Sequence, residues 1–443
     1  MFRFCFLLAL LLSTSAFAEP VSFTREIAPL LQSQCLACHN ARKAEGAFRV
    51  DSFERVSQAG ESGEHGVVAK ESEQSELLVR LTSSDKDLRM PKDRAPLPPV
   101  QIELVRRWIE EGASYDSEDP AAPLITIIPP PIHPAAPENY PAPLPITALA
   151  YHPQGKELYV GGYHEITIWN TEQGTLLKRI GNLDQRIYAI SFSPDSERIA
   201  VACGTPGRHG EVRILRATTG ELLKVIAPAG DVALAAAWNP AGDQIAVGGT
   251  DQAIHLYNTS TFAELHTFTS HSDWVFALAW NHDGTRLASA SRDKTAKLFD
   301  PQTHELLATY SQHESPVQGI AFDLTGKELF SLGNQQLHRW RIAEEKALRK
   351  EGTSGDGLEL IAGKESLFVA TAANKIKQFR RQEGKPAGEY AGPSEACISV
   401  ALHEASQQLA AGTFSGEVWI WKVGEIQPLR HFLALPGAEM RER

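Results

Sequence analysis

A repeat of 39 to 46 residues runs through most of the second part of the 443-residue chain. Seven short alternating strands carry a large apolar residue at the same place. These residues are Trp169, Leu215, Tyr257, Phe299, Trp340, Phe379 and Trp421, and their successive separations are 46, 42, 42, 41, 39 and 42 residues. A unit of this length holds four short strands and cannot bury both of its faces alone. The repeat therefore requires units that stack on one another.

The fourth unit resembles a WD-repeat blade most closely. His271 precedes its inner strand, Ser289 and Asp293 flank a tight turn, and Phe299 stands at the position of the Trp of the repeat. In that family these four positions form a hydrogen-bonded peg, and the resemblance implies the same peg here. The fifth to seventh units keep the spacing but lose most of the polar residues. We expect an all-β, seven-bladed WD-repeat propeller over residues 144–435.

Two details of the propeller stay open at this point. The outer strand of the last blade is supplied either by the final unit itself, around 429–433, or by the apolar segment 124–128 from the N-terminal side. The inner strands are mainly Ala, Ile, Val and Leu, without an evident His cluster for a metal, and we interpret His133 and the propeller histidines as structural or exposed. Cys203 and Cys397 are expected to be buried thiols rather than a disulfide.

The remaining domain boundaries follow from composition. Arg3, the apolar run 4–12 and the small residues Ala16 and Ala18 predict a signal peptide over residues 1–18. Residues 19–115 form a small helical domain, 116–143 a Pro-rich linker with an extended conformation, and 436–443 a C-terminal tail. We expect an exported, periplasmic or otherwise extracytoplasmic, soluble protein with no membrane span in the mature chain. The net charge of −11 argues against nucleic acid as a partner.

Cys35, Cys38 and His39 form the C-x-x-C-H pattern of covalent haem attachment. Two thiols about one helical turn apart reach the two vinyl groups of one porphyrin edge, and the adjacent His lies beneath the iron as proximal ligand. The alternatives are a redox dithiol or half of a zinc site. Zinc would need further ligands, but residues 19–115 contain no third Cys and only His65 as another imidazole. The pattern predicts one haem c.

Met90 is the candidate sixth ligand of that iron, because it is the sole methionine of the domain. Pro91 biases it away from helical geometry, which favours a loop that crosses the haem face. His65, in a Gly-rich stretch, is the rival. Two amphipathic helices are expected on either side, one carrying Phe23, Ile27, Leu30 and Leu31, the other lying between Pro99 and Gly112 with Ile102, Val105, Trp108 and Ile109 on one face. Packing of these two helices would form the shell of the haem.

The segment from Val21 to Tyr115 resembles the planctomycete-type cytochrome c domain. The features that carry the resemblance are an opening helix, CLACH at 35–39, EGAFRVDS at 45–52, a Gly-rich turn at 60–66, LRMP at 88–91 and RWIEEGA at 107–113. The family usually has a second Pro after Met-Pro, where this chain has Lys92. The resemblance implies a small all-α, class I-like cytochrome c domain with one covalent haem c, and with His39 and Met90 as the axial pair.

An iron with His and Met ligands is saturated and passes single electrons. The expectation is therefore an electron carrier rather than an enzyme, with a redox partner protein and a propeller that docks proteins. Three alternatives stay open. One is a redox enzyme whose propeller holds a second cofactor, similar to cytochrome cd-type nitrite reductases or quinohaemoproteins, although those propellers usually have eight blades. The others are a haem sensor or peroxidase from which Met90 departs, and an adhesion module.

Overall fold

The structure is a computed structural model that describes residues 19–41 and 43–437. The predicted signal peptide, residues 1–18, and residues 438–443 of the predicted tail lie outside the described residues. The chain divides into two compact units, one that ends at Pro131 and one that begins at Ile132. Across the described ranges, every helix is too short or too polar to cross a membrane.

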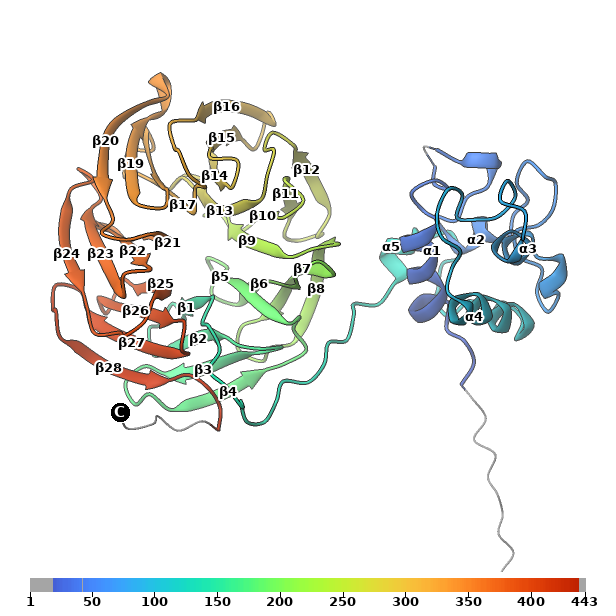
Figure 1. The fold of residues 1–443 in the computed structure, drawn as a ribbon, viewed down its shortest axis with the longest axis horizontal. Coiled ribbons are helices and arrows are strands. Elements are labelled where there is room, and N and C mark those ends of the chain that lie inside the picture. The colour runs from blue at the N-terminus through green and yellow to red at the C-terminus, as the bar shows by residue number, and fades with distance from the viewer. Residues whose placement is uncertain (1–18, 42, 438–443) are drawn as a thin grey trace, which may run out of the picture. The chain divides into compact units, whose positions relative to one another are not determined.

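The first unit consists of short helices joined by loops (Figure 1). Its helical segments are the π-helical turn η1 (Phe23–Ile27), α1 (Ala28–Gln34), the 3₁₀ turn η2 (Glu45–Ala47), α2 (Phe53–Val56), the 3₁₀ turn η3 (Ser72–Gln74), α3 (Glu76–Thr82), α4 (Pro99–Glu110) and α5 (Leu124–Ile127).

The two predicted amphipathic helices pack against each other in the core of this unit. Ser22 caps the first of them, because its Oγ accepts a hydrogen bond from the Arg25 amide at 3.1 Å. The Phe23 ring lies 5.4 Å from the Trp108 ring of α4, and both side chains are fully buried. The first turn is π-helical rather than α-helical. The predicted helix between Pro99 and Gly112 is α4, and Gly112 follows it with a positive φ of 112° that suits a glycine.

Parts of the Pro-rich stretch are packed on one unit or the other. Leu124, in α5, is buried in the core of the first unit, and Pro123 pairs with Ser52 as an isolated β-bridge. Segment 124–128 is therefore not a propeller strand. Further along, Tyr140 already belongs to the second unit, and its hydroxyl donates a 2.5 Å hydrogen bond to Glu165 of the same unit.

Within residues 132–437, consecutive strands form seven four-stranded antiparallel sheets arranged as the blades of a propeller (Figure 1). The predicted seven-bladed fold is confirmed. The first three blades are β1 (Leu149–Tyr151), β2 (Glu157–Gly161), β3 (Ile166–Asn170) and β4 (Leu176–Ile180); β5 (Arg186–Phe192), β6 (Arg198–Thr205), β7 (His209–Arg216) and β8 (Leu222–Ala229); and β9 (Ala233–Trp238), β10 (Gln244–Gly249), β11 (Ile254–Asn258) and β12 (Glu264–Phe268). The fourth and fifth are β13 (Val275–Trp280), β14 (Leu287–Ser291), β15 (Ala296–Asp300) and β16 (Glu305–Tyr310); and β17 (Gly319–Phe322), β18 (Glu328–Leu332), β19 (Gln336–Arg341) and β20 (Lys346–Gly352). The last two are β21 (Gly357–Ala362), β22 (Ser366–Thr371), β23 (Lys375–Arg380) and β24 (Pro386–Tyr390); and β25 (Cys397–His403), β26 (Gln408–Thr413), β27 (Glu417–Lys422) and β28 (Pro428–Leu433).

The ring closes without a strand from outside the last repeat. The outer strand of the last blade is β28, which is the first of the two alternatives that the sequence left open. Two hydrogen bonds cross the junction between the last and first blades, beside a shared apolar cluster. The Ile146 amide donates to the Thr413 carbonyl at 3.1 Å, and the Ser399 hydroxyl donates to the Ile146 carbonyl at 2.6 Å.

The repeated apolar positions form the cores between the blades. All seven are buried, with at most 7% of the surface of any one of them exposed: Trp169, Leu215, Tyr257, Phe299, Trp340, Phe379 and Trp421. Cys203 and Cys397 are buried free thiols, as predicted. Burial at a fixed position in every unit explains why the repeat keeps large apolar residues there.

The fourth blade contains the expected peg. His271 donates from Nδ1 to Asp293 Oδ2 at 2.7 Å, and its Nε2 lies 2.7 Å from the Ser289 hydroxyl. The Thr295 hydroxyl donates to the other Asp293 oxygen at 2.6 Å. Burial alone would raise the pKa of Asp293, but the hydrogen bonds from His271 and Thr295 hold the pKa well below its usual range. The carboxylate is therefore part of what stabilises the blade at neutral pH.

Replacing this carboxylate is expected to lower stability in a pH-dependent way. Asp293→Asn should reduce the free energy of unfolding at pH 7 by about 1–3 kcal/mol, because it weakens buried, charge-assisted hydrogen bonds. The pKa of Asp293 is lower in the folded than in the unfolded chain, so the stabilisation is complete above the ordinary pKa of an Asp, about 4, and is lost as the pH falls below it. The difference between the two proteins should shrink at pH 3.

Urea unfolding followed by far-ultraviolet circular dichroism at pH 7 and pH 3 measures this effect. Asp356→Asn, which changes an exposed carboxylate, is the control and should have little effect at either pH. A constant difference between the Asp293 variant and the parent at both pH values would contradict the proposed role of the ionised peg.

Candidate haem site

One cavity of about 790 Å³ in the first unit brings the candidate ligands together. Cys35, Cys38, His39 and Met90 all line it. Its walls come from the end of α1 and the chain up to residue 50, from the Gly-rich loop 60–64, from one face of α3 and from the loop 90–94. A volume of this size is in the range of pockets that hold cofactors.

The attachment motif continues helix α1 by one turn. Cys35 follows the last helical residue, Gln34, and its carbonyl accepts hydrogen bonds from the amides of Cys38 at 3.2 Å and His39 at 3.1 Å. This turn brings all three motif side chains to the cavity wall. Both cysteines are half-buried free thiols. The chain therefore offers two thiols and an imidazole to one cavity.

The His39 ring is oriented for ligation through Nε2. Its Nδ1 lies 3.2 Å from the carbonyl oxygen of Phe48 and donates a hydrogen bond to it. The other ring nitrogen then carries the lone pair that a metal needs. The Phe48 ring also packs at 5.6 Å from the imidazole, and the Val50 amide donates to the His39 carbonyl at 2.9 Å. No pattern in the sequence marks Phe48 as a positioning residue.

Met90 lines the same cavity, although it lies 51 residues after His39 in the sequence. It lies in the loop after α3, where its amide donates to the Arg80 carbonyl at 3.0 Å. The rival ligand His65 is exposed, does not line the cavity, and has its Nδ1 3.1 Å from the Ser57 carbonyl. The structure thus brings Met90, and not His65, to the cavity that contains His39.

The cavity wall differs in one respect from the expectation. Helix α4 packs on the first helix as predicted, but it contributes no lining residue; α3 does, through Glu76, Leu77, Arg80 and Leu81. The prediction that the first and last helices form the shell was therefore wrong about the last one. Apolar residues at 77, 78 and 81, with an ion pair of 2.7 Å between Arg80 and Glu76, are the pattern that would have revealed α3.

The surroundings of the thiols argue against the two alternative uses of the motif. Burial and, to a smaller extent, the nearby Cys38 raise the pKa of the Cys35 thiol to about 11. A reactive redox dithiol needs the opposite shift. In the described part of the chain, none of Cys35, Cys38 and His39 belongs to a group of three or more possible ligands at metal-binding distances. The free thiols, the available Nε2 and the cavity volume together fit a haem.

The fold and this cavity define a chain with a cytochrome c-like domain and a WD-repeat propeller. Residues 35–94 match the model of the family Planctomycete cytochrome C, and residues 262–300 match that of the WD domain, G-beta repeat. No curated protein matches the chain. The first match covers the cavity walls almost completely, from Cys35 to Arg94. The chain therefore combines a region similar to the planctomycete cytochrome c family, which contains a cavity that fits a haem, with a WD-type propeller, a fold that serves protein interactions.

Proposed function

We propose that this protein is an exported, mono-haem c-type cytochrome that transfers single electrons, and that its propeller docks a redox partner protein. The observation that carries the proposal is the single cavity lined by Cys35, Cys38, His39 and Met90. The proposal includes a class I-like domain over residues 19–115, a linker over 116–143 and a propeller over 144–435.

Each ligand residue has one role in this proposal. Cys35 and Cys38 each bind the porphyrin through a thioether, His39 binds the iron through Nε2, and Met90 binds it through sulfur. Bound haem supplies one-electron chemistry, which Met ligation shifts to a higher potential. The chain itself orients the imidazole through the Phe48 carbonyl and places Leu77 and Leu81 against the cavity. These apolar walls limit the access of water to the site.

The compartment is inferred from the N-terminal segment, and the kind of redox partner is inferred from the net charge. A cleaved signal peptide delivers the chain to the compartment in which thioether-bound haem is used. The net charge of −11 favours a redox partner with a basic surface, because opposite charges speed the encounter of two proteins. The WD type of the propeller supports the docking of a protein on it.

Met90→Ala tests the axial pair. The variant should keep its covalent haem, because neither thiol is changed, but its reduction potential should fall by on the order of 100 mV, since the axial ligand is a main determinant of haem potential. The reduced variant should also bind carbon monoxide, which the parent should resist. A redox titration followed by absorption spectroscopy measures the reduction potential. Absorption spectra of the reduced protein with carbon monoxide measure the binding of that ligand.

His65→Ala is the matched control, because it removes the rival ligand and should leave the potential unchanged. An unchanged potential in the Met90 variant, or a lowered one in the His65 variant, would reject Met90 as ligand. Spectra of the parent protein in oxidised, reduced and carbon-monoxide-treated forms test the alternatives. Rapid carbon monoxide binding by the parent would indicate a sensor, and a second chromophore would indicate an enzyme.

A further inference from the structure

The second blade of the propeller departs from the others in its central hairpin. Strands β6 and β7 are each eight residues long, whereas β14 and β15 of the fourth blade are each five. The ladder extends to the pair Thr205 and His209. This extra length accounts for the longest of the repeat spacings, 46 residues. It also places His209, Glu211 and Arg213 on one face of β7, because alternate residues of a strand point the same way.

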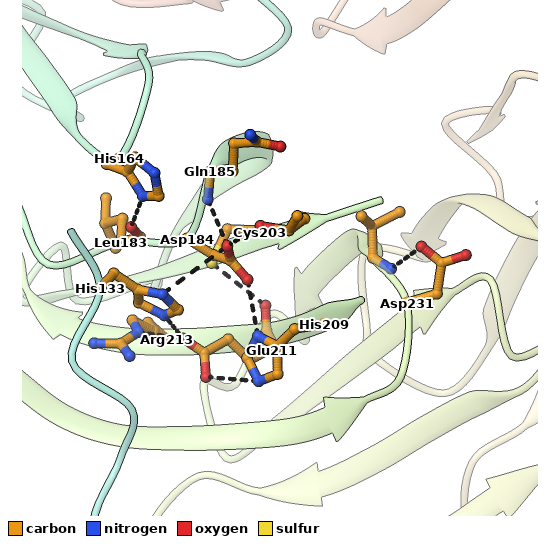
Figure 2. Close-up of polar contacts among 12 residues, drawn as sticks. His133, His164, Leu183, Asp184, Gln185, Cys203, His209, Glu211, Arg213 and Asp231 are labelled. Carbon is orange, nitrogen blue, oxygen red and sulfur yellow. Dashed lines mark hydrogen bonds and ion pairs between the residues drawn. The ribbon is translucent and has the colours of Figure 1, made fainter. Parts of the chain in front are cut away.

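Two imidazoles and two carboxylates meet on that face (Figure 2). His133 Nε2 lies 2.7 Å from Glu211 Oε1, and His209 Nδ1 lies 2.8 Å from Asp184 Oδ2. The other two separations are 3.9 Å, from His133 Nδ1 to Asp184 Oδ1, and 3.8 Å, from His209 Nε2 to Glu211 Oε2. Side-chain exposure is 9% for His133, 4% for Asp184, 35% for His209 and 0% for Glu211.

One oxygen of this cluster has no hydrogen-bond partner although it is buried. Glu211 Oε1 is bonded to His133 and to the fully buried Arg213, but Glu211 Oε2 accepts no hydrogen bond. A buried carboxylate oxygen without a partner is costly. This oxygen lies 3.8 Å from His209 Nε2, and so it faces the group of potential ligands.

We propose that His133, Asp184, His209 and Glu211 form a binding site for one divalent transition-metal ion of the Zn²⁺ type. Imidazole nitrogen with carboxylate oxygen is a donor set that Zn²⁺ favours, whereas Ca²⁺ and Mg²⁺ prefer oxygen alone. Four donors at about 2.0–2.1 Å from zinc are about 3.3 Å apart in a tetrahedron. An ion takes one donor atom from each residue, and one such atom of each of His133, Asp184 and His209 lies within 4.8 Å of the other two. Side-chain movements of about 1.5 Å or less would therefore bring these three donors to the separation that zinc needs.

The neighbouring groups already fix two of the ligands. The Thr205 hydroxyl and the Gln185 amide both donate 2.6 Å hydrogen bonds to Asp184 Oδ1, which leaves Oδ2 for the ion. Arg213 holds Glu211 and donates from Nη1 to the Asn182 carbonyl at 2.8 Å. The Arg213 charge offsets one carboxylate, and Asp184 remains as the anionic ligand for the cation. Such outer contacts orient the ligands of a metal site.

The position of the site gives the ion a structural role. His133 belongs to the lead-in segment, residues 132–143, whereas Asp184, His209 and Glu211 belong to the second blade and the connection that precedes it. The His133 amide also donates to the Asn182 side chain at 2.9 Å. A bound ion would join residues 51 and 76 positions apart in the sequence, and so would fasten the lead-in segment to the blade.

The test uses the full-length holoprotein after dialysis against a chelator, followed by titration with Zn²⁺ alone. Isothermal calorimetry and elemental analysis of zinc, counted separately from the haem iron, should show one equivalent bound. His209→Gln should lower the affinity at least 100-fold. Glutamine can still donate to Asp184, and His209 is partly exposed, so the variant is expected to fold; circular dichroism verifies this. Co²⁺ added to the parent should give, in the difference spectrum against the same haem protein without the ion, the intense visible absorption of a four-coordinate ion.

His255→Ala is the matched control. His255 lies between two carboxylates, 2.7 Å from Asp251 and 2.8 Å from Glu264, but that group contains one imidazole only. Its replacement should leave the stoichiometry and affinity of zinc unchanged. Equal zinc binding by the parent and the His209 variant, absence of bound zinc in the parent, or the weak spectrum of six-coordinate Co²⁺ would each overturn the proposal.

Discussion

A chain with both Cys35→Ala and Cys38→Ala is expected to contain no covalently bound haem. Both thiols line the cavity beside His39, and each supplies one of the two proposed thioethers. Without them a haem would be held by its proposed axial ligands alone and would be lost under denaturing conditions. The measurement is haem staining on a denaturing gel, together with the mass of the intact protein, after expression in a host that matures c-type cytochromes.

The propeller supplies a matched control for this experiment. Cys203→Ala and Cys397→Ala remove buried free thiols of the second unit and should leave the haem stain unchanged. Each single replacement in the motif should leave one thioether and a stained band. A stained band from the double variant, or a colourless parent protein from a competent host, would remove the basis of the electron-transfer proposal.

Trp340→Ala is expected to destabilise the propeller by about 3–5 kcal/mol, because a fully buried aromatic side chain leaves a large cavity when it is truncated. Trp340 is one of the seven repeated positions, and its ring stacks on Tyr310 at a centroid distance of 4.8 Å. Urea unfolding followed by far-ultraviolet circular dichroism reports on the strands. The haem absorbance, followed in the same titration, reports on the first unit. This unit should unfold at the same urea concentration as in the parent.

Trp340→Phe separates packing from hydrogen bonding. The indole nitrogen of Trp340 is buried and has no hydrogen-bond partner, so phenylalanine keeps most of the ring contacts and loses no hydrogen bond. Its cost should be below about 1.5 kcal/mol. A phenylalanine variant as unstable as the alanine variant would show that the position does not act through packing volume, and would contradict the role assigned to the repeated apolar residues.

The repeat could be predicted from the sequence because its signal is local and recurs seven times. A large apolar residue at a constant position, such as Phe299 or Trp421, has to be buried in every blade, and the number of blades follows from the number of such positions. The attachment motif was equally local, since Cys35, Cys38 and His39 are within five residues. For the same reason the helix between Pro99 and Gly112 was located correctly from its end signals.

Features that depend on tertiary contacts could not be predicted. The apolar run after Pro123 is short enough to be a strand or a helix, and its burial in the core of the first unit made it a helix. The contribution of α3 to the cavity and the Phe48 carbonyl under His39 depend on how distant segments meet. The group around His133 and His209 has a single trace in the sequence, the long spacing of the second repeat unit, and this spacing alone does not indicate which side chains meet.

The way in which the propeller ring closes has a consequence for its mechanical behaviour. Each blade is made of consecutive strands, so no strand is shared across the point where the first and last blades meet. The end of the lead-in segment and the chain after the last blade meet there, since the Tyr140 amide donates to the Pro436 carbonyl at 3.4 Å. This seam joins its two sides by non-covalent contacts only, whereas the chain itself crosses the other six junctions. Under load, the ring would therefore part at the seam first and open into a curved row of intact sheets.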